Sequence, residues 1–129
     1  MSQSALDSTA ESARAASTLL RTGFHTAVDA TDASLVLRLR GELDMASAPG
    51  LARSLDTVLD ARPAAVTLDL TDLTFVDSSG IHVLIIACRR AGSEGCSFAL
   101  RAPCRSVLKA LRLTGVDRLM VIKQASALL

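Results

Sequence analysis

Alternating apolar and polar residues run along two stretches of the chain, a period of two that is typical of half-buried β-strands. This pattern predicts strands over Leu35–Arg40 and Val66–Leu70. A further short strand is expected at Ser97–Arg101, and weaker candidates lie at Phe24–Val28 and Leu119–Ile122. The sequence therefore predicts a sheet of four or five strands.

Between these strands, apolar residues recur at the spacing of one helix face. The first helix is expected to begin near Ser47, whose side chain can cap free amides, and to stop at Pro63. The second is expected to begin at Ser78 or Ser79 and to end near Gly92. The residues expected to face the core are Leu51, Leu55, Val58 and Leu59 in the first helix and Ile81, Leu84, Ile85 and Cys88 in the second, with Val83, Ile86 and Ala87 extending the second face toward full burial.

A third helix is expected between Pro103 and Gly115. Strands that alternate with helices of this length favour an α/β structure with a largely parallel sheet packed against helices. We expect one such domain over residues 24–129, whose tail from Lys123 has room for one more helical segment. Residues 1–23 are rich in Ser, Thr and Ala and are expected to form a mobile or partly helical arm.

Composition narrows the possible functions. The chain has 129 residues, a formal net charge of +1, and neither Trp nor Tyr. A nucleic-acid-binding protein normally shows a basic excess and stacking aromatic residues, so direct nucleic-acid binding is not expected. The longest apolar run, Val83–Cys88, is far shorter than the roughly twenty residues that span a bilayer. We therefore expect a cytoplasmic protein with no membrane span.

The cysteines and histidines do not form the pattern of a metal site. Three cysteines form no CxxC pair and only two histidines accompany them, so no metal site is expected. The cysteines are interpreted as small buried apolar residues. Because phosphate-cradling glycine loops are also missing from the sequence, no cofactor is expected.

The polar quartet Asp77–Gly80 interrupts two strongly apolar flanks. One interpretation is structural, with a serine capping the amides at the start of the second helix. Another is functional, with a serine hydroxyl presented at a helix N-terminus that favours a phosphoryl group. Both can hold if one serine caps and the other is modified.

A serine hydrolase is a competing interpretation, because His82 lies four residues after Ser78 and Asp77 is adjacent. An acid next to the nucleophile in sequence cannot easily orient a histidine one turn along, and the GxSxG pattern of a nucleophile elbow is missing. Catalysis is therefore not expected.

Three blocks in order carry a resemblance to a known family: Gly41–Asp44, Leu73–Gly80 and Leu113–Gly115. Together they resemble the STAS-domain family of bacterial anti-sigma factor antagonists over roughly Phe24 to Ile122. The resemblance implies a small domain that works by binding rather than by catalysis. Ile81 stands where the family often has Leu, and the position of His82 is often Gly or another residue.

The resemblance also implies partners. Family members bind an anti-sigma factor, usually a serine kinase, and thereby release a sigma factor. The kinase phosphorylates the first serine of the DSSG block, and a PP2C-type phosphatase reverses the modification. On this chain Ser78 is the implied phospho-acceptor.

The surface around Ser78 is then expected to bind the partner. Its expected contributors are Asp44, Asp77, Ser79, Gly80 and His82. The alternative is a STAS subunit that docks on a membrane transporter ATPase, of the lipid-trafficking type, without phosphoregulation. The sequence leaves the oligomeric state open.

Overall fold

The computed structural model describes residues 23–124 and contains a five-stranded sheet in the order β1-β2-β3-β4-β5. The strands are β1 (His25–Thr31), β2 (Ser34–Leu43), β3 (Ala65–Val76), β4 (Ser97–Arg101) and β5 (Val121–Lys123). Only β1 is antiparallel to its neighbour, and the other pairs are parallel. The predicted α/β class with a mostly parallel sheet is confirmed.

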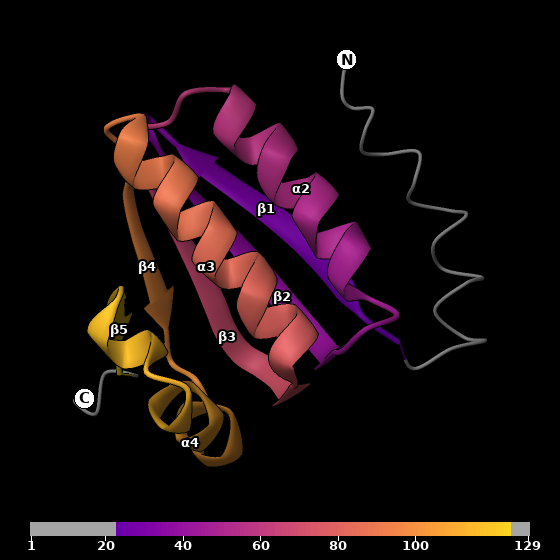
Figure 1. The fold of residues 1–129 in the computed structure, drawn as a ribbon. Coiled ribbons are helices and arrows are strands. Elements are labelled where there is room, and N and C mark those ends of the chain that lie inside the picture. Colours follow the sequence, from indigo (N-terminus) through magenta and orange to yellow (C-terminus); the bar gives the residue numbers. More distant parts are fainter. Residues whose placement is uncertain (1–22, 125–129) are drawn as a thin grey trace.

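Helices α2 and α3 run side by side across one face of the sheet (Figure 1). The helical elements are α2 (Ala48–Asp60), α3 (Ser78–Ser93), α4 (Arg105–Leu113) and the short 3-10 helix η2 (Val116–Arg118). α4 packs against β3 at the end of the sheet where β4 finishes (Figure 1). Among the described residues, no helix is both long and apolar enough to cross a bilayer.

Leucines fill the space between the sheet and the helices. The fully buried ones are Leu37, Leu39, Leu43, Leu51, Leu55, Leu59, Leu68, Leu70, Leu73, Leu84, Leu100 and Leu111. Burying one such side chain contributes about 1.5–3 kcal/mol. The alternation along β2 and β3 therefore predicted the core-facing side of the sheet correctly.

The central strands are longer than their alternation indicated. β2 was expected to end at Gly41 but continues to Leu43. Gly41 has φ +104°, and the pairing of β2 with β3 shifts register there, so the strand bends instead of ending. β3 likewise extends to Val76 through residues that do not alternate. These extensions carry both strands to the edge where the quartet lies.

The helix ends also differ from expectation. α3 runs past Gly92 to Ser93, and Gly95, with φ +76°, follows its C-cap. Ile86 is 51% exposed, so full burial of that face was wrong. Helix α4 begins at Arg105 rather than at Pro103, because Cys104 is its N-cap residue with an extended backbone.

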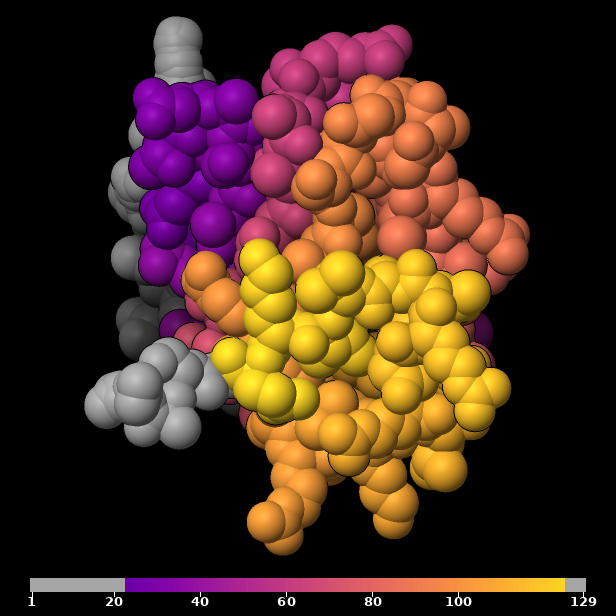
Figure 2. Space-filling view, turned by 90° about the vertical axis from the view of Figure 1, so that its left-hand side faces the viewer, coloured from indigo at the N-terminus to yellow at the C-terminus, as the bar shows by residue number. Residues whose placement is uncertain are grey.

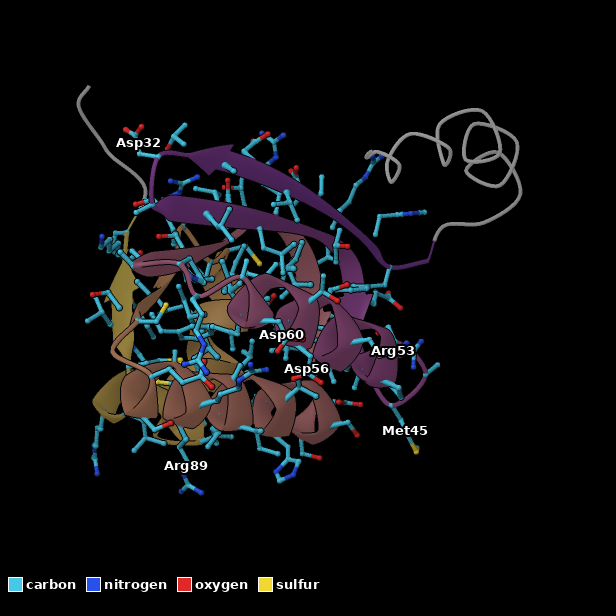
Figure 3. All side chains as sticks on the ribbon, turned by 90° about the horizontal axis from the view of Figure 1, so that it is seen from above. Asp32, Met45, Arg53, Asp56, Asp60 and Arg89 are labelled. Carbon is cyan, nitrogen blue, oxygen red and sulfur yellow. The ribbon has the colours of Figure 1, made fainter. Side chains whose placement is uncertain are left out.

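The C-terminal half of α3 is tied to α2 by ion pairs. Arg90 contacts Asp56 at 3.3 Å and Asp60 at 2.6 Å, both on α2, and Glu94 at 2.9 Å. Figure 3 shows Asp56 and Asp60 on the side of α2 that faces α3. These pairs and the apolar face of each helix fix the two helices relative to each other.

The two edges of the sheet are unlike each other. β1 is exposed along most of its length, whereas β5 is a strand of three residues that follows η2. In Figure 2 the indigo surface of the β1 region and the yellow surface of the η2–β5 region lie on the same side of the molecule. The expected arm over residues 1–23 lies outside the described residues except for Gly23, and the last five residues of the tail also lie outside them.

Candidate partner-binding site

The quartet lies where two parallel strands end together. β3 ends at Val76, which pairs in register with Leu43 at the end of β2. Asp77 follows, and α3 begins at Ser78. The Asp77 amide donates a hydrogen bond of 3.1 Å to the Leu43 carbonyl oxygen. The segment after β2 and the start of α3 therefore form one surface, as predicted for Asp44 and the quartet.

Asp77, rather than a serine, caps α3. Its Oδ1 accepts hydrogen bonds from the Ser79 amide at 2.8 Å and the Gly80 amide at 3.2 Å. Its carbonyl oxygen accepts from the Ile81 amide at 3.0 Å. The carboxylate thus satisfies the Ser79 and Gly80 amides and is also favoured by the positive end of the helix dipole. The expectation that one of the two serines caps the helix was therefore wrong.

This cap leaves Ser78 exposed as the first residue of α3. Within residues 23–124 its hydroxyl makes no side-chain hydrogen bond, whereas Ser79 is half-buried. The two serines are thus distinct. Ser78 is the one whose hydroxyl is open to a visiting protein.

The cap also changes the electrostatics expected at Ser78. Two amides of the first turn are already bound to the Asp77 carboxylate. A phosphoryl group on Ser78 would compete with that carboxylate for those amides and would repel it. The helix N-terminus is therefore a weaker anion site here than the position alone suggested.

Gly80 is buried beneath this surface. A Cβ at this position would overlap the Leu43 side chain and would lie 3.0 Å from Cγ2 of Val76. Glycine is required because the first turn of α3 lies directly on the ends of β2 and β3. Gly80 thus lies beneath this surface, and its contribution to partner binding stays a prediction.

Hydrogen bonds within its own turn hold Asp44. Its Oδ1 accepts from the Ala46 amide at 3.0 Å and from the Ser47 amide at 3.1 Å. Ser47 Oγ accepts from the Asp44 amide at 2.9 Å and donates to the Glu42 carbonyl oxygen at 2.8 Å. Ser47 was expected to cap α2, but its side chain closes this turn instead and makes no cap bond.

Two apolar side chains at this edge were not predicted to be exposed. Met45, in the turn after β2, is 75% exposed and projects from the ribbon (Figure 3), and Phe75, near the end of β3, is 46% exposed. Phe75 comes where the alternation of β3 breaks down, because Thr74 before it is also exposed. In the sequence, Leu73, Thr74 and Phe75 still alternate, so the pattern gave no signal of this exposure. Exposed Met and aromatic side chains are common in protein interfaces.

His82 is exposed one turn along α3 from Ser78, as expected. The carboxylate of Asp77 binds backbone amides, which is a capping role rather than the orienting role of a hydrolase acid. Across residues 23–124, no cluster of His, Cys, Asp or Glu is placed to hold a metal ion. The third block ends α4, where Gly115 adopts φ +80°.

The cysteines fit their expected role only in part. All three are free, and Cys96 is buried, but Cys88 and Cys104 are half-buried. Burial raises the pKa of the Cys88 and Cys96 thiols. A hydrogen bond with Ser106 and bonds from backbone amides of α4 lower the pKa of Cys104. None of the three belongs to the surface around Ser78.

Several known proteins have a similar fold. An anti-sigma factor antagonist from Mycobacterium paratuberculosis is 27% identical, with a TM-score of 0.70 over 81% of this chain and 89% of that one. The Thermotoga maritima protein TM1081 is 25% identical, with a TM-score of 0.73 over 79% and 88%. Bacillus SpoIIAA in its phosphorylated form shares the fold at 21% identity, with a TM-score of 0.62 over 80% and 93%.

The family model described as "Mlab, STAS domain" matches residues 26–123. This range includes the whole quartet and every strand, apart from the first residue of β1. Both the sequence match and the fold therefore lead to the same assignment. The chain belongs to the STAS domain family.

Proposed function

We propose that this protein is an anti-sigma factor antagonist that acts by binding rather than by catalysis. In its unphosphorylated form it binds an anti-sigma factor of the serine kinase type in the cytoplasm and so releases a sigma factor. Phosphorylation of Ser78 ends that binding, and a PP2C-type phosphatase restores it. The observation that carries the proposal is the exposed Ser78 hydroxyl beside a helix cap that does not use it.

The similarity to an anti-sigma factor antagonist at 27% identity supports this class. The arrangement around Ser78 supports the switch. A phosphoryl group adds about −1.5 to −2 charge at neutral pH. The charge would lie next to the Asp77 carboxylate, whose own hydrogen bonds already satisfy two amides of the helix.

Such a charge acts on binding more than on folding. Ser78 is exposed, so in the free protein water solvates the phosphate and the domain keeps its shape. In an interface formed with the serine, the same group must be desolvated without a designed partner. A penalty of roughly 2.7 kcal/mol already weakens binding a hundredfold.

Two observations favour a second function. The matching family model is described as Mlab, and the Asp77 cap gives the quartet a structural role that needs no phosphorylation. We propose as the alternative a STAS subunit that docks on a membrane transporter ATPase through the same surface.

Partner identity separates the two functions. The full chain, immobilised as bait in extracts of its own cells, is expected to retain an anti-sigma factor kinase. The purified kinase should then bind the serine form at least about a hundredfold more tightly than a form with phosphoserine at position 78. Retention of a transporter ATPase without any such kinase would contradict the leading proposal and support the alternative.

A further inference from the structure

His82 and Ser78 lie on the same exposed side of α3. They are four residues apart, which places their Cβ atoms about 5–6 Å from each other in a helix. Side chains on a helix generally lean toward its N-terminus, which is the direction of Ser78 from His82. A phosphoryl group on the Ser78 oxygen would therefore be within reach of the imidazole.

The backbone at the start of α3 does not provide a ready alternative. The amides of Ser79 and Gly80 donate to the Asp77 carboxylate, and the Ile81 amide donates to the Asp77 carbonyl oxygen. A phosphate on Ser78 would meet amides that already have partners and a carboxylate in the preceding residue. These three amides therefore offer the phosphate no free donor, and a protein contact to it would come from a side chain.

Cations on the neighbouring elements are engaged or further along the chain. On α2, the Arg53 guanidinium turns back toward Gly50, with Nη2 3.8 Å from the position of a Cβ there. Arg90 of α3 binds Asp56 and Asp60 of α2. Arg90 is therefore already paired with acids of α2.

Two other cations lie on α3 and α4, and one acid lies in the turn after β2. Arg89 is seven residues beyond His82, about 10 Å along the helix axis, and projects from α3 (Figure 3). Arg105 begins α4, which packs against β3. The Asp44 carboxylate accepts from two amides of its own turn. His82 is thus the group on α3 best placed to carry positive charge beside Ser78.

We infer that His82 is the intramolecular partner of phosphorylated Ser78, with the imidazolium binding the phosphate across one turn of α3. This inference rests on the proposed function for its role in the cell. The residue at position 82 then affects the pKa of the phosphate on Ser78.

A phosphorus NMR titration tests the pairing. Phosphoserine is placed at position 78 of the full chain by genetic encoding, so that no kinase is needed. Free phosphoserine has a second pKa of about 6. We expect the midpoint of the phosphate titration to be lower in the wild type than in His82→Gln by about half a pH unit. The shift is small because both groups are exposed and solvent and salt screen their interaction.

Control variants distinguish an effect of His82 from the electrostatic effect of the other positively charged residues. His82→Lys keeps a cation at the position and should retain the lower midpoint. Arg89→Gln and Arg105→Gln remove the other nearby cations and should titrate like the wild type. Identical midpoints in the wild type and in a folded His82→Gln variant would overturn the inference, as would a shift caused by Arg105→Gln instead.

The NMR result and the test of the proposed function can succeed or fail independently. If the midpoint shift is found but no kinase labels Ser78, the pairing stands and the proposed switch fails. If Ser78 is labelled but His82→Gln leaves the midpoint unchanged, the switch stands and the pairing fails. Nitrogen–proton spectra of each variant establish that α3 is intact in both comparisons.

Discussion

The Asp77 amide donates its hydrogen bond to the Leu43 carbonyl oxygen, and this contact joins the start of α3 to the end of β2. The next residue along each chain segment, Ser78 or Asp44, is therefore presented at the same edge of the sheet. The contact brings the two sequence blocks Gly41–Asp44 and Leu73–Gly80 together in the fold. They position an exposed serine on a rigid support formed by two parallel strands.

Gly80 should tolerate no larger residue. In Gly80→Ala, the new Cβ overlaps the Leu43 side chain, so either that side chain or the first turn of α3 must move. We expect a loss of about 1–3 kcal/mol in the free energy of unfolding, measured by urea denaturation. Gly92→Ala is the matched control in the same helix, because nothing lies within 4 Å of its Cβ position. That change should be neutral or stabilising, and equal losses at both sites would contradict the close packing at Gly80.

Substitutions at Asp77 and Ser78 are expected to differ in their effect on the free energy of unfolding. Asp77→Ala removes the acceptor for two amides and should lower the free energy of unfolding by about 1 kcal/mol. Ser78→Ala should change it by less than about 0.5 kcal/mol, because the side chain is exposed. Thermal unfolding of the two variants measures both effects. A destabilisation that is greater for Ser78→Ala would show that the serine hydroxyl supports the fold.

Thiol reactivity should follow burial and hydrogen bonding. Cys104 is half-buried and its pKa is lowered by the hydrogen bond with Ser106, whereas burial raises the pKa of Cys96. Alkylation with iodoacetamide, followed by peptide mass spectrometry, is expected to modify Cys104 first and Cys96 last, because the thiolate is the reactive form. Modification of Cys96 before Cys104 in the folded protein would contradict this order.

Asp69 should contribute stability that depends on pH. Burial raises its pKa, but hydrogen bonds from Thr71 and the ion pair with Arg101 at 3.0 Å outweigh burial and hold the pKa below its usual value. A lowered pKa in the folded state stabilises the protein above the unfolded value of about 4, and this contribution is lost as the pH falls through the folded value.

Asp69→Asn should therefore be less stable than the wild type at neutral pH, by up to about 1 kcal/mol, and the difference should shrink in acid. Urea denaturation at a series of pH values measures it. Asp29→Asn is the control, because the Asp29–Arg38 pair is more than half exposed and should contribute little. A difference between Asp69→Asn and the wild type that grows as the pH falls would contradict the assigned direction.

The sequence predicted the parts of the fold that depend on periodic burial. Leucine alternation located β2 and β3, and the spacing of Leu51, Leu55 and Leu84 located the inner faces of α2 and α3. Strand ends were predicted less well, because Gly41 bends β2 without ending it. That distinction depends on pairing with β3, which no local pattern reveals.

At the site, the sequence identified the quartet and the exposed serine but assigned the cap to the wrong kind of side chain. Asp and Ser are both good N-cap residues, so propensity alone could not choose between Asp77 and the serines. The choice depends on where β3 ends, since Asp77 is the residue left with an extended backbone. The exposure of Met45 and Phe75 likewise depends on how the two strand ends meet.

The most direct test of the account is phosphate transfer to the intact protein. The full chain is incubated with ATP and the anti-sigma factor kinase that binds it, and the phosphorylated residue is mapped by mass spectrometry. We expect one phosphate, on Ser78, and no labelling of Ser78→Ala, while Ser79→Ala is labelled like the wild type. Labelling of Ser78→Ala at the wild-type rate would contradict the central claim that the Ser78 hydroxyl is the switch.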